Sequence, residues 1–333
     1  MTQAGQSRSA SKQGPGFDIL AFGARYGTLI ALLLLLIFNL AFTRNFATLQ
    51  TLNVNLTQVC TIVIVATGMT LVIATGGIDL SVGSIMAIAG AIAPLIFLSP
   101  VFGEHVALAV AVAMVAAILA ATLCGLFNGW LIAQFRIQPI VATLVLFIAG
   151  RGIAQALTNS NLQVFKVPEF QWIGLGRPLG IPVQVIVMVV LVVFAAWMLR
   201  RTQFGRSILA TGGNERAAEL SGIPVKSTKL AVYAISGFCA GIAGLVIIAI
   251  NSASDANLVG LGMELDAIAA VAVGGTLLSG GRATIVGTLI GALTIQLVRY
   301  TLLANGVPDA AALVVKAAII VLAVWLQQQR RDI

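Results

Sequence analysis

The sequence predicts an all-α polytopic membrane protein with about ten transmembrane helices, some of them broken, and an internal repeat. Its composition is 59% hydrophobic and only 9% charged, and its mean hydropathy is +1.04. Soluble domains carry roughly 25% charged residues, so a chain this poor in charge cannot cover a water-facing surface. The apolar residues also gather into long runs that basic loops separate. Lipid is therefore expected to be the main solvent of this chain.

Ten apolar runs approach the length of about 20 residues that a helix needs to cross a bilayer. The first run is expected to be a retained span, because it is long and lacks a good small-residue cleavage site. The third run is short and contains Pro94, and the eighth begins with Glu264 and Asp266, whose charges place that end near an interface. The runs comprise residues 26–42, 56–75, 84–98, 106–133, 139–157, 183–199, 229–250, 263–279, 283–304 and 309–327.

The charges in the loops predict the orientation, because Lys and Arg are enriched on the cytoplasmic side of a membrane protein. With the N-terminus in the cytoplasm, only Arg44, Lys166 and Arg177 fall in outer loops, and both termini lie inside. The predicted parts are a cytoplasmic N-terminal tail at 1–25, a transmembrane domain at 26–327 with a large inner loop at 200–228, and a cytoplasmic C-terminal tail at 328–333.

Composition and motifs argue against several other classes of function. The net charge is +8, but Lys and Arg lie between apolar runs and form no basic, aromatic-interleaved face for nucleic acid. Cys60, Cys124 and Cys239 lack metal-site or disulfide spacing and are read as buried hydrophobic residues. A single histidine and no paired carboxylates within a span argue against an enzyme. No phosphate-cradling Gly-x-x-x-x-Gly-Lys-Ser/Thr sequence occurs, so any ATPase would be a separate chain.

A glycine-rich motif occurs twice, each time between two apolar runs. Residues 76–83 and 274–281 share the pattern Gly-Gly-x-x-Leu-Ser-x-Gly. Such interruptions in corresponding halves are typical of transporters whose broken helices line the path, although two tight turns between hydrophobic hairpins also fit the pattern. Whether the halves run parallel or inverted stays open. The candidate path residues are Gly76, Gly77, Asp79, Ser81, Gly274, Gly275 and Ser279.

Asp79 favours the path interpretation of the first motif. An Asp at a helix centre costs about 2.5–3.5 kcal/mol on insertion scales, so it needs a partner, an aqueous cavity or a capping role. A cap on the helix that starts near Leu80 is the structural alternative. In a path, Ser81 and Ser279 would offer hydroxyls to a polar substrate, and a hydrogen bond would hold Asp79.

The inner loop at 200–228 predicts a short docking helix at residues 215–221. Asn214 is a good N-cap, Glu215 suits the positive end of the helix dipole, and Pro224 prevents continuation. The helix is expected between two glycine turns, at Gly212–Gly213 and at Gly222. A solvated connector would need only a few residues, which favours docking into a partner. The docking surface is expected to be small, with a charged rim, and comprises Ala217, Ala218, Ser221, Arg216 and Glu219.

Three stretches carry a family resemblance. They are residues 66–84 (Ala-Thr-Gly-Met-Thr-Leu-Val-Ile-Ala-Thr-Gly-Gly-Ile-Asp-Leu-Ser-Val-Gly-Ser), the loop segment 212–223, and residues 264–282, which contain the second glycine motif. In combination they resemble the permease subunits of bacterial monosaccharide ABC importers, the group that contains ribose, xylose and galactofuranose permeases. Residues 136–152 and the Ser-Asp-Ala-Asn sequence at 254–257 look closest to galactofuranose-type permeases.

This resemblance implies a multi-pass protein of the bacterial inner membrane with ten helices, working as a homo- or heterodimer of permeases. It implies a cytoplasmic ATPase that holds ATP and Mg, no cofactor on this chain, a periplasmic sugar-binding protein and a monosaccharide substrate whose identity the sequence does not fix. The inner loop is similar to the family's coupling helix. The coupling residues implied are Gly212, Gly213, Asn214, Glu215, Arg216, Ala217, Ala218, Glu219, Ser221 and Gly222.

Two further expectations concern the outer face and the energy source. The loop at 251–262 lacks Lys and Arg and is expected to face outward, where it would meet the binding protein together with residues 158–182. Its candidate contact residues are Asn251, Asp255 and Asn257. The alternative to an ATP-driven importer is a secondary transporter in which Asp79 carries a proton, but the spans hold almost no other acidic residues for a relay.

Overall fold

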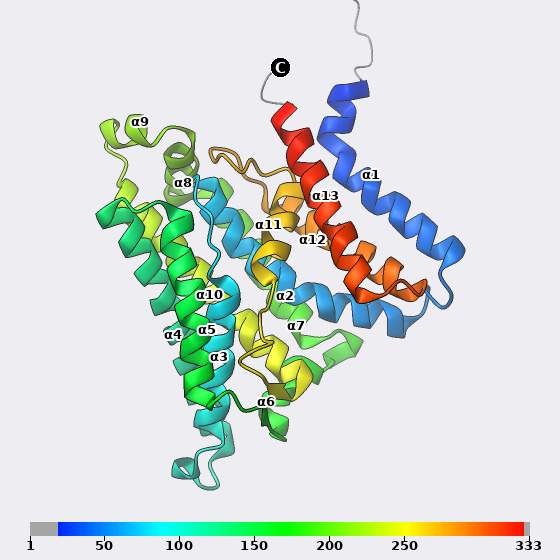
Figure 1. Cartoon of the computed structure of the whole chain (residues 1–333), viewed down its shortest axis with the longest axis vertical. Helices are drawn as coiled ribbons and strands as arrows, with labels where there is room; N and C mark the ends of the chain where they lie inside the picture. Colours follow the sequence, from blue (N-terminus) through cyan, green and yellow to red (C-terminus); the bar gives the residue numbers. More distant parts are fainter. Residues whose placement is uncertain (1–18, 330–333) are drawn as a thin grey trace, which may run out of the picture.

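The computed structural model describes residues 19–329, and Figure 1 shows them as a bundle of helices joined by short turns. Residues 1–18 and 330–333 of the predicted tails lie outside the described residues. The helices are α1 (Ile19–Phe42), α2 (Leu49–Ala74), α3 (Val82–Phe97), η1 (Pro100–Phe102), α4 (Val106–Phe135), α5 (Pro139–Thr158), α6 (Pro168–Leu175), η2 (Pro178–Gly180), α7 (Val183–Arg201), α8 (Gln203–Gly213), α9 (Glu215–Leu220), α10 (Val225–Asn251), α11 (Met263–Val273), α12 (Ile285–Ala304) and α13 (Asp309–Gln329). The strands are β1 (Gln163–Val164) and β2 (Ala253–Ser254).

The all-α class is confirmed for the described residues, and six of their helices are long and apolar enough to cross a bilayer. These six are α2, α4, α5, α7, α10 and α12. Shorter apolar helical stretches occur at Gly27–Phe42, Val82–Phe97 and Ala310–Ile319. The total of about ten spans and the internal repeat therefore stay predictions.

Several helix boundaries differ from those that the sequence predicts, among them the start of α1 and the end of α11. Helix α1 begins at Ile19, so residues 19–25 of the predicted tail are helical. Helix α11 ends at Val273, so only part of the run 263–279 is helical. The chain leaves that helix at Gly274 and Gly275, and Gly275 has a φ of 82°, which favours glycine because it has no Cβ. Both motifs therefore interrupt apolar runs, as expected for broken helices.

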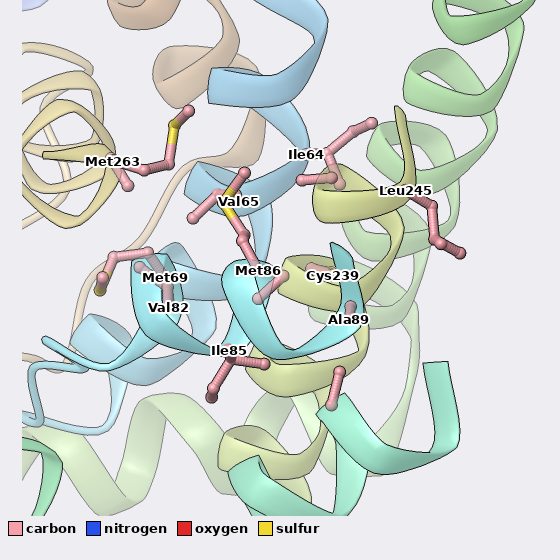
Figure 2. Close-up of a cluster of buried hydrophobic side chains, with 14 of the residues drawn as sticks. Ile64, Val65, Met69, Val82, Ile85, Met86, Ala89, Cys239, Leu245 and Met263 are labelled. Atoms are coloured by element: carbon pink, nitrogen blue, oxygen red, sulfur yellow. The ribbon is translucent and has the colours of Figure 1, made fainter. Parts of the chain in front are cut away.

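The centre of the bundle is the second half of α2. Every residue from Val59 to Ala74 is buried, as apolar, small and threonine side chains pack against α7, α10, α11 and α12. Figure 2 shows part of this core, where Met69 of α2, Met86 of α3, Cys239 of α10 and Met263 of α11 gather. This packing positions the starts of α3 and α11 inside the molecule.

Small residues allow α4 and α10 to pack backbone to backbone. A Cβ on Gly125 would lie 2.3 Å from the carbonyl oxygen of Tyr233, and one on Gly237 would lie 2.4 Å from that of Ala121. Close approach through glycine is a common way for helices to associate where lipid provides no hydrophobic driving force between them. The α4–α10 pair is thereby a rigid support for the segment between α2 and α3.

The two ends of the bundle differ in what they carry (Figure 1). One end, here called the α9 end, holds α8 and α9 together with the two glycine motifs, the second of which contacts α8. The opposite α6 end holds η1, α6 and the loop after α10. At the α6 end β1 pairs antiparallel with β2, with Gln163 opposite Ser254, so the loops at 158–182 and 251–262 lie together.

Candidate functional site

The two glycine motifs contact each other at the α9 end. The amide of Gly281 donates a hydrogen bond of 3.0 Å to the carbonyl of Ala74, the last residue of α2. A Cβ on Gly280 would lie 2.7 Å from the amide nitrogen of Gly76. Both Gly76 and Gly280 have positive φ angles, 81° and 86°, so this contact requires glycine on both sides. Two segments about 200 residues apart in the sequence therefore form one junction.

Asp79 lies fully buried in the first motif, and its carboxylate is saturated by neutral donors. Its Oδ1 accepts hydrogen bonds from the amide and hydroxyl of Ser81, at 3.0 and 2.6 Å, and its Oδ2 accepts one of 2.8 Å from the Ser236 hydroxyl of α10. Among the described residues no cation forms an ion pair with it. The expectation that a hydrogen bond holds Asp79 is confirmed, and the bonds tie the turn to α10.

The expectation that Ser81 offers its hydroxyl to a substrate is wrong for this structure. Ser81 is fully buried, its hydroxyl donates to Asp79, and its oxygen accepts from the side-chain amide of Asn128 at 2.8 Å. The donor of this hydroxyl and one of its two acceptor positions are therefore occupied, and its burial keeps it from a solute. Gly77 is also buried, because a Cβ there would lie 2.4 Å from the Tyr233 hydroxyl.

The second motif is more open. Gly275 and Ser279 are exposed, as is Gly76 of the first motif, whereas Gly274 is buried with its Cα close to the backbone of Gly287. The hydroxyl of Thr276 accepts a hydrogen bond of 3.1 Å from the amide of Thr284, which closes the turn before α12. Of the seven predicted path residues, these three exposed ones can meet a solute at the α9 end.

The inner loop contains one more helix than predicted. Gly212 and Gly213 do not form a turn but are the last residues of α8. Glycine is needed at position 212 because α8 packs closely against the end of α2, and not because the chain turns there. A Cβ on Gly212 would lie 1.9 Å from the carbonyl oxygen of Ala74. Its own carbonyl oxygen would lie 2.9 Å from a Cβ on Gly280. The end of α8 thus packs against the last residue of α2, just before the first glycine motif, and against the second glycine motif.

Helix α9 forms where the sequence predicts it. The side-chain oxygen of Asn214 accepts a hydrogen bond of 3.0 Å from the amide of Ala217, and Gly222 ends the segment with a φ of 80°. Arg216, Ala217 and Glu219 are exposed, as expected for a docking surface.

Ala218 was predicted to be part of that surface, and the structure corrects this. Its side chain is only 4% exposed, because it faces the chain's own helices while its carbonyl accepts from the amide of Ile223. The prominent apolar residue of α9 is instead Leu220, which is 79% exposed and which the sequence analysis missed. The sequence did contain a signal for this exposed leucine, because Leu220 lies in the last turn of a capped helix, shortly after two alanines.

A cavity of about 670 Å³ lies beside α9, between this helix, the α4–α5 connection and the start of α10. The ion pair between Lys229 and Glu215, with 2.7 Å between Nζ and Oε1, crosses from α10 to α9. The charged residues that line the cavity are Arg136, Glu215, Arg216, Glu219, Lys226 and Lys229. The α9 end therefore presents a recess lined by both charged and apolar residues, close to the exposed Leu220.

At the α6 end the three predicted contact residues lie in one loop region. Asn251 and Asn257 are exposed, and Asp255 is half-buried. The Oδ1 of Asp255 accepts hydrogen bonds from the backbone and side-chain amides of Asn257, and Gln155 of α5 donates to Asn257 at 2.7 Å. Asp255 shapes this loop, whereas Asn251 and Asn257 are available to a partner.

The chain matches a known family over most of its length. The profile of the family described as branched-chain amino acid transport system / permease component matches residues 52–324. The chain belongs to this permease family. With six helices of sufficient length and apolarity in its described part, the permease is a multi-pass membrane protein.

Curated relatives of this permease are import permeases for several sugars. The ribose import permease of Escherichia coli strain K12 is 42% identical over 308 residues, which are 91% of this chain and 94% of the relative. The galactofuranose transporter permease of the same strain is 40% identical over 275 residues, 83% of this chain and 79% of the relative. A fructose import permease of Bifidobacterium longum is 38% identical over 268 residues, 79% of this chain and 73% of the relative. The similar identities do not distinguish between these sugars.

Proposed function

We propose that this permease is the membrane-spanning subunit of an ATP-driven importer that carries a monosaccharide, galactofuranose among the candidates, into the cytoplasm. The substrate class is supported by the names of the relatives, which cover ribose, galactofuranose and fructose. In this assignment the α9 end faces the cytoplasm with both termini, and the α6 end faces the periplasm. The loop charges support this orientation.

The observation that carries the proposal is the contact of α8 with the end of α2, two residues before the first glycine motif, and with the second glycine motif. Helix α9 is capped, exposed and separated from α8 by Asn214 alone. A partner bound tightly to α9 would move the end of α8. Gly212 would pass this displacement on to Ala74 and Gly281, because no flexible side chain lies between them. Packed interfaces shift between discrete arrangements rather than deform continuously. Docking at α9 can therefore change the helix breaks.

The partners follow from what this chain lacks and what it exposes. It contains no phosphate-cradling motif, so ATP and Mg would be held by a separate cytoplasmic ATPase that receives Leu220, Ala217 and Arg216. A periplasmic sugar-binding protein would meet Asn251 and Asn257 at the α6 end. A second permease, identical or related, would complete the path.

The proposal is tested by reconstituting the tagged permease in lipid vesicles with the ATPase and binding protein that co-purify with it. Uptake of radiolabelled D-ribose, D-fructose and D-galactose is measured with ATP on the cytoplasmic side, with and without vanadate. We expect vanadate to abolish uptake of at least one sugar and a proton ionophore to leave it unchanged. Uptake that survives vanadate but stops with the ionophore would instead identify a proton-coupled transporter.

The docking surface is tested with Leu220→Glu, which replaces the exposed leucine by a charge. We expect it to reduce the amount of ATPase that co-purifies by about tenfold, the equivalent of 1.4 kcal/mol, because one well-packed apolar anchor carries energy of this order at an interface. The matched control is Leu162→Glu, since Leu162 is an exposed leucine at the opposite end. Equal ATPase yield from both variants would contradict docking at α9.

A further inference from the structure

The start of α3 meets the turn just before α11 inside the molecule through two glycines, Gly83 and Gly260. A Cβ on Gly83 would lie 2.2 Å from the carbonyl oxygen of Gly260, and a Cβ on Gly260 would lie 2.3 Å from that of Gly83. The two backbones are therefore in direct contact, and this contact is called the Gly83–Gly260 seam below. Figure 1 shows that both helices begin between the two ends of the bundle.

Glu264, in the first turn of α11, faces this seam. Its side chain is only 6% exposed, and its Oε2 has no hydrogen-bond partner among the described residues. The same oxygen would lie 2.6 Å from a Cβ on Gly83. A buried acceptor without a donor is unfavourable, so its presence at this place calls for a functional explanation.

The two other acids near these helix starts are both partnered. Asp79 accepts three hydrogen bonds from Ser81 and Ser236, and Asp266 pairs with Lys316 of α13. A structural role therefore accounts for Asp79 and Asp266 but does not account for the second carboxylate oxygen of Glu264.

Polar groups lead from the α6 end toward Glu264. The Nη1 of Arg151 on α5 donates to the carbonyls of Ala256 and Val259 at 2.8 and 2.6 Å, which holds the loop just before the seam. Arg151 lies within electrostatic range of both Glu264 and Asp255. A neighbouring guanidinium disfavours a bound metal cation at Glu264. A neutral ligand with hydroxyl donors suits this carboxylate better, because hydroxyls can donate to it without adding charge.

We propose that Glu264 is a contact residue for hydroxyl groups of the transported sugar, at a gate that the Gly83–Gly260 seam closes. The inference rests on the proposed function, since it needs a sugar that passes through this chain. In the closed state the seam excludes solute and leaves Oε2 without a donor. When α3 and α11 separate, a sugar hydroxyl supplies that donor, and the bound sugar favours the open state because it contacts that state alone.

The first test compares Glu264→Gln with Glu264→Leu in the reconstituted complex. Glutamine keeps the size and one acceptor but removes the charge, whereas leucine removes all hydrogen bonding. We expect uptake to fall about tenfold with glutamine and further with leucine, while ATP hydrolysis without binding protein and the yield of complex stay normal. Glu104→Gln is the matched control, because Glu104 is an exposed glutamate in the η1–α4 connection.

The second test uses the wild-type complex and does not depend on how a variant folds. Dicyclohexylcarbodiimide modifies carboxyl groups in apolar surroundings, and mass mapping of peptides locates the modified residue. During turnover the transported sugar should protect Glu264 from modification, whereas the exposed Glu104 should stay unmodified with or without sugar. Wild-type uptake by both Glu264 variants, or modification of Glu264 that sugar does not alter, would overturn the assignment. Failure of the proposed function is distinct, because the wild-type complex would then take up no sugar with ATP.

Discussion

Replacing Gly212 by Ala tests the junction between α8 and the glycine motifs. The new Cβ would lie 1.9 Å from the carbonyl oxygen of Ala74, and real Cβ contacts essentially never fall below 3.0 Å. The segments must therefore separate by at least 1.1 Å, the difference between these two values. Overpacking of this kind costs about 1–3 kcal/mol, and loss of the hydrogen bond from Gly281 to Ala74 adds about 0.5–1.5 kcal/mol. Alanine regains at most about 1 kcal/mol of helix propensity, which leaves a net loss of about 0.5–4.5 kcal/mol.

The assay is thermal unfolding of the purified permease in detergent, together with the ratio of sugar uptake to ATP hydrolysis in vesicles. We expect Gly212→Ala to lower the unfolding midpoint and to reduce this ratio, because the end of α8 no longer seats on Ala74. Gly213→Ala is the matched stability control, since nothing lies within 4 Å of a Cβ at that position, and it should unfold at or above the wild-type midpoint. Equal midpoints for the two variants, with wild-type uptake in Gly212→Ala, would refute the wedged junction.

Two further predictions follow from the observed contacts. Asp79→Asn should retain most uptake, because asparagine keeps the acceptor that Ser81 uses and can bond Ser236 through its amide; uptake near background with normal protein abundance would show instead that the charge is required. Asn257→Cys should react with a membrane-impermeant maleimide added to the periplasmic side of intact cells after outer-membrane permeabilisation, and reaction only from the cytoplasmic side would reverse the orientation.

The position of the docking helix was predicted correctly, because single residues at its two ends determine where it begins and ends. The Asn214 cap and the Gly222 terminus place a helix at 215–221, and α9 occupies Glu215–Leu220. Helix α8 was missed because Gly205, Gly212 and Gly213 disfavour a helix by propensity. Gly205 and Gly212 are instead required by packing, since a Cβ on Gly205 would lie 2.3 Å from the carbonyl oxygen of Leu199 and one on Gly212 would lie 1.9 Å from that of Ala74.

Long-range contacts explain what the sequence left open about the site. Nothing near Asp79 in the sequence indicates that Ser236, on α10, would donate to its carboxylate. Nor does the pattern of α9 show that Ala218 is buried, because a six-residue helix can be turned either way by the chain that follows it. The unpartnered oxygen of Glu264 likewise becomes visible only when α3 and α11 are placed together.

The pairing of β1 with β2 has a thermodynamic consequence for the proposed importer. Gln163 and Ser254 pair, the amide of Phe165 donates to the carbonyl of Ser252, and Arg151 fixes Val259, which directly precedes Gly260. The loops at 158–182 and 251–262 are thus connected, through these hydrogen bonds and the backbone, to one half of the seam. By linkage, any preference of a docked protein for the loops of the open state must appear equally as a shift of the seam toward opening. A binding protein whose sugar-loaded form binds the open-state loops more tightly than the closed-state loops would then favour opening of the seam. It would do so without inserting any segment into the membrane.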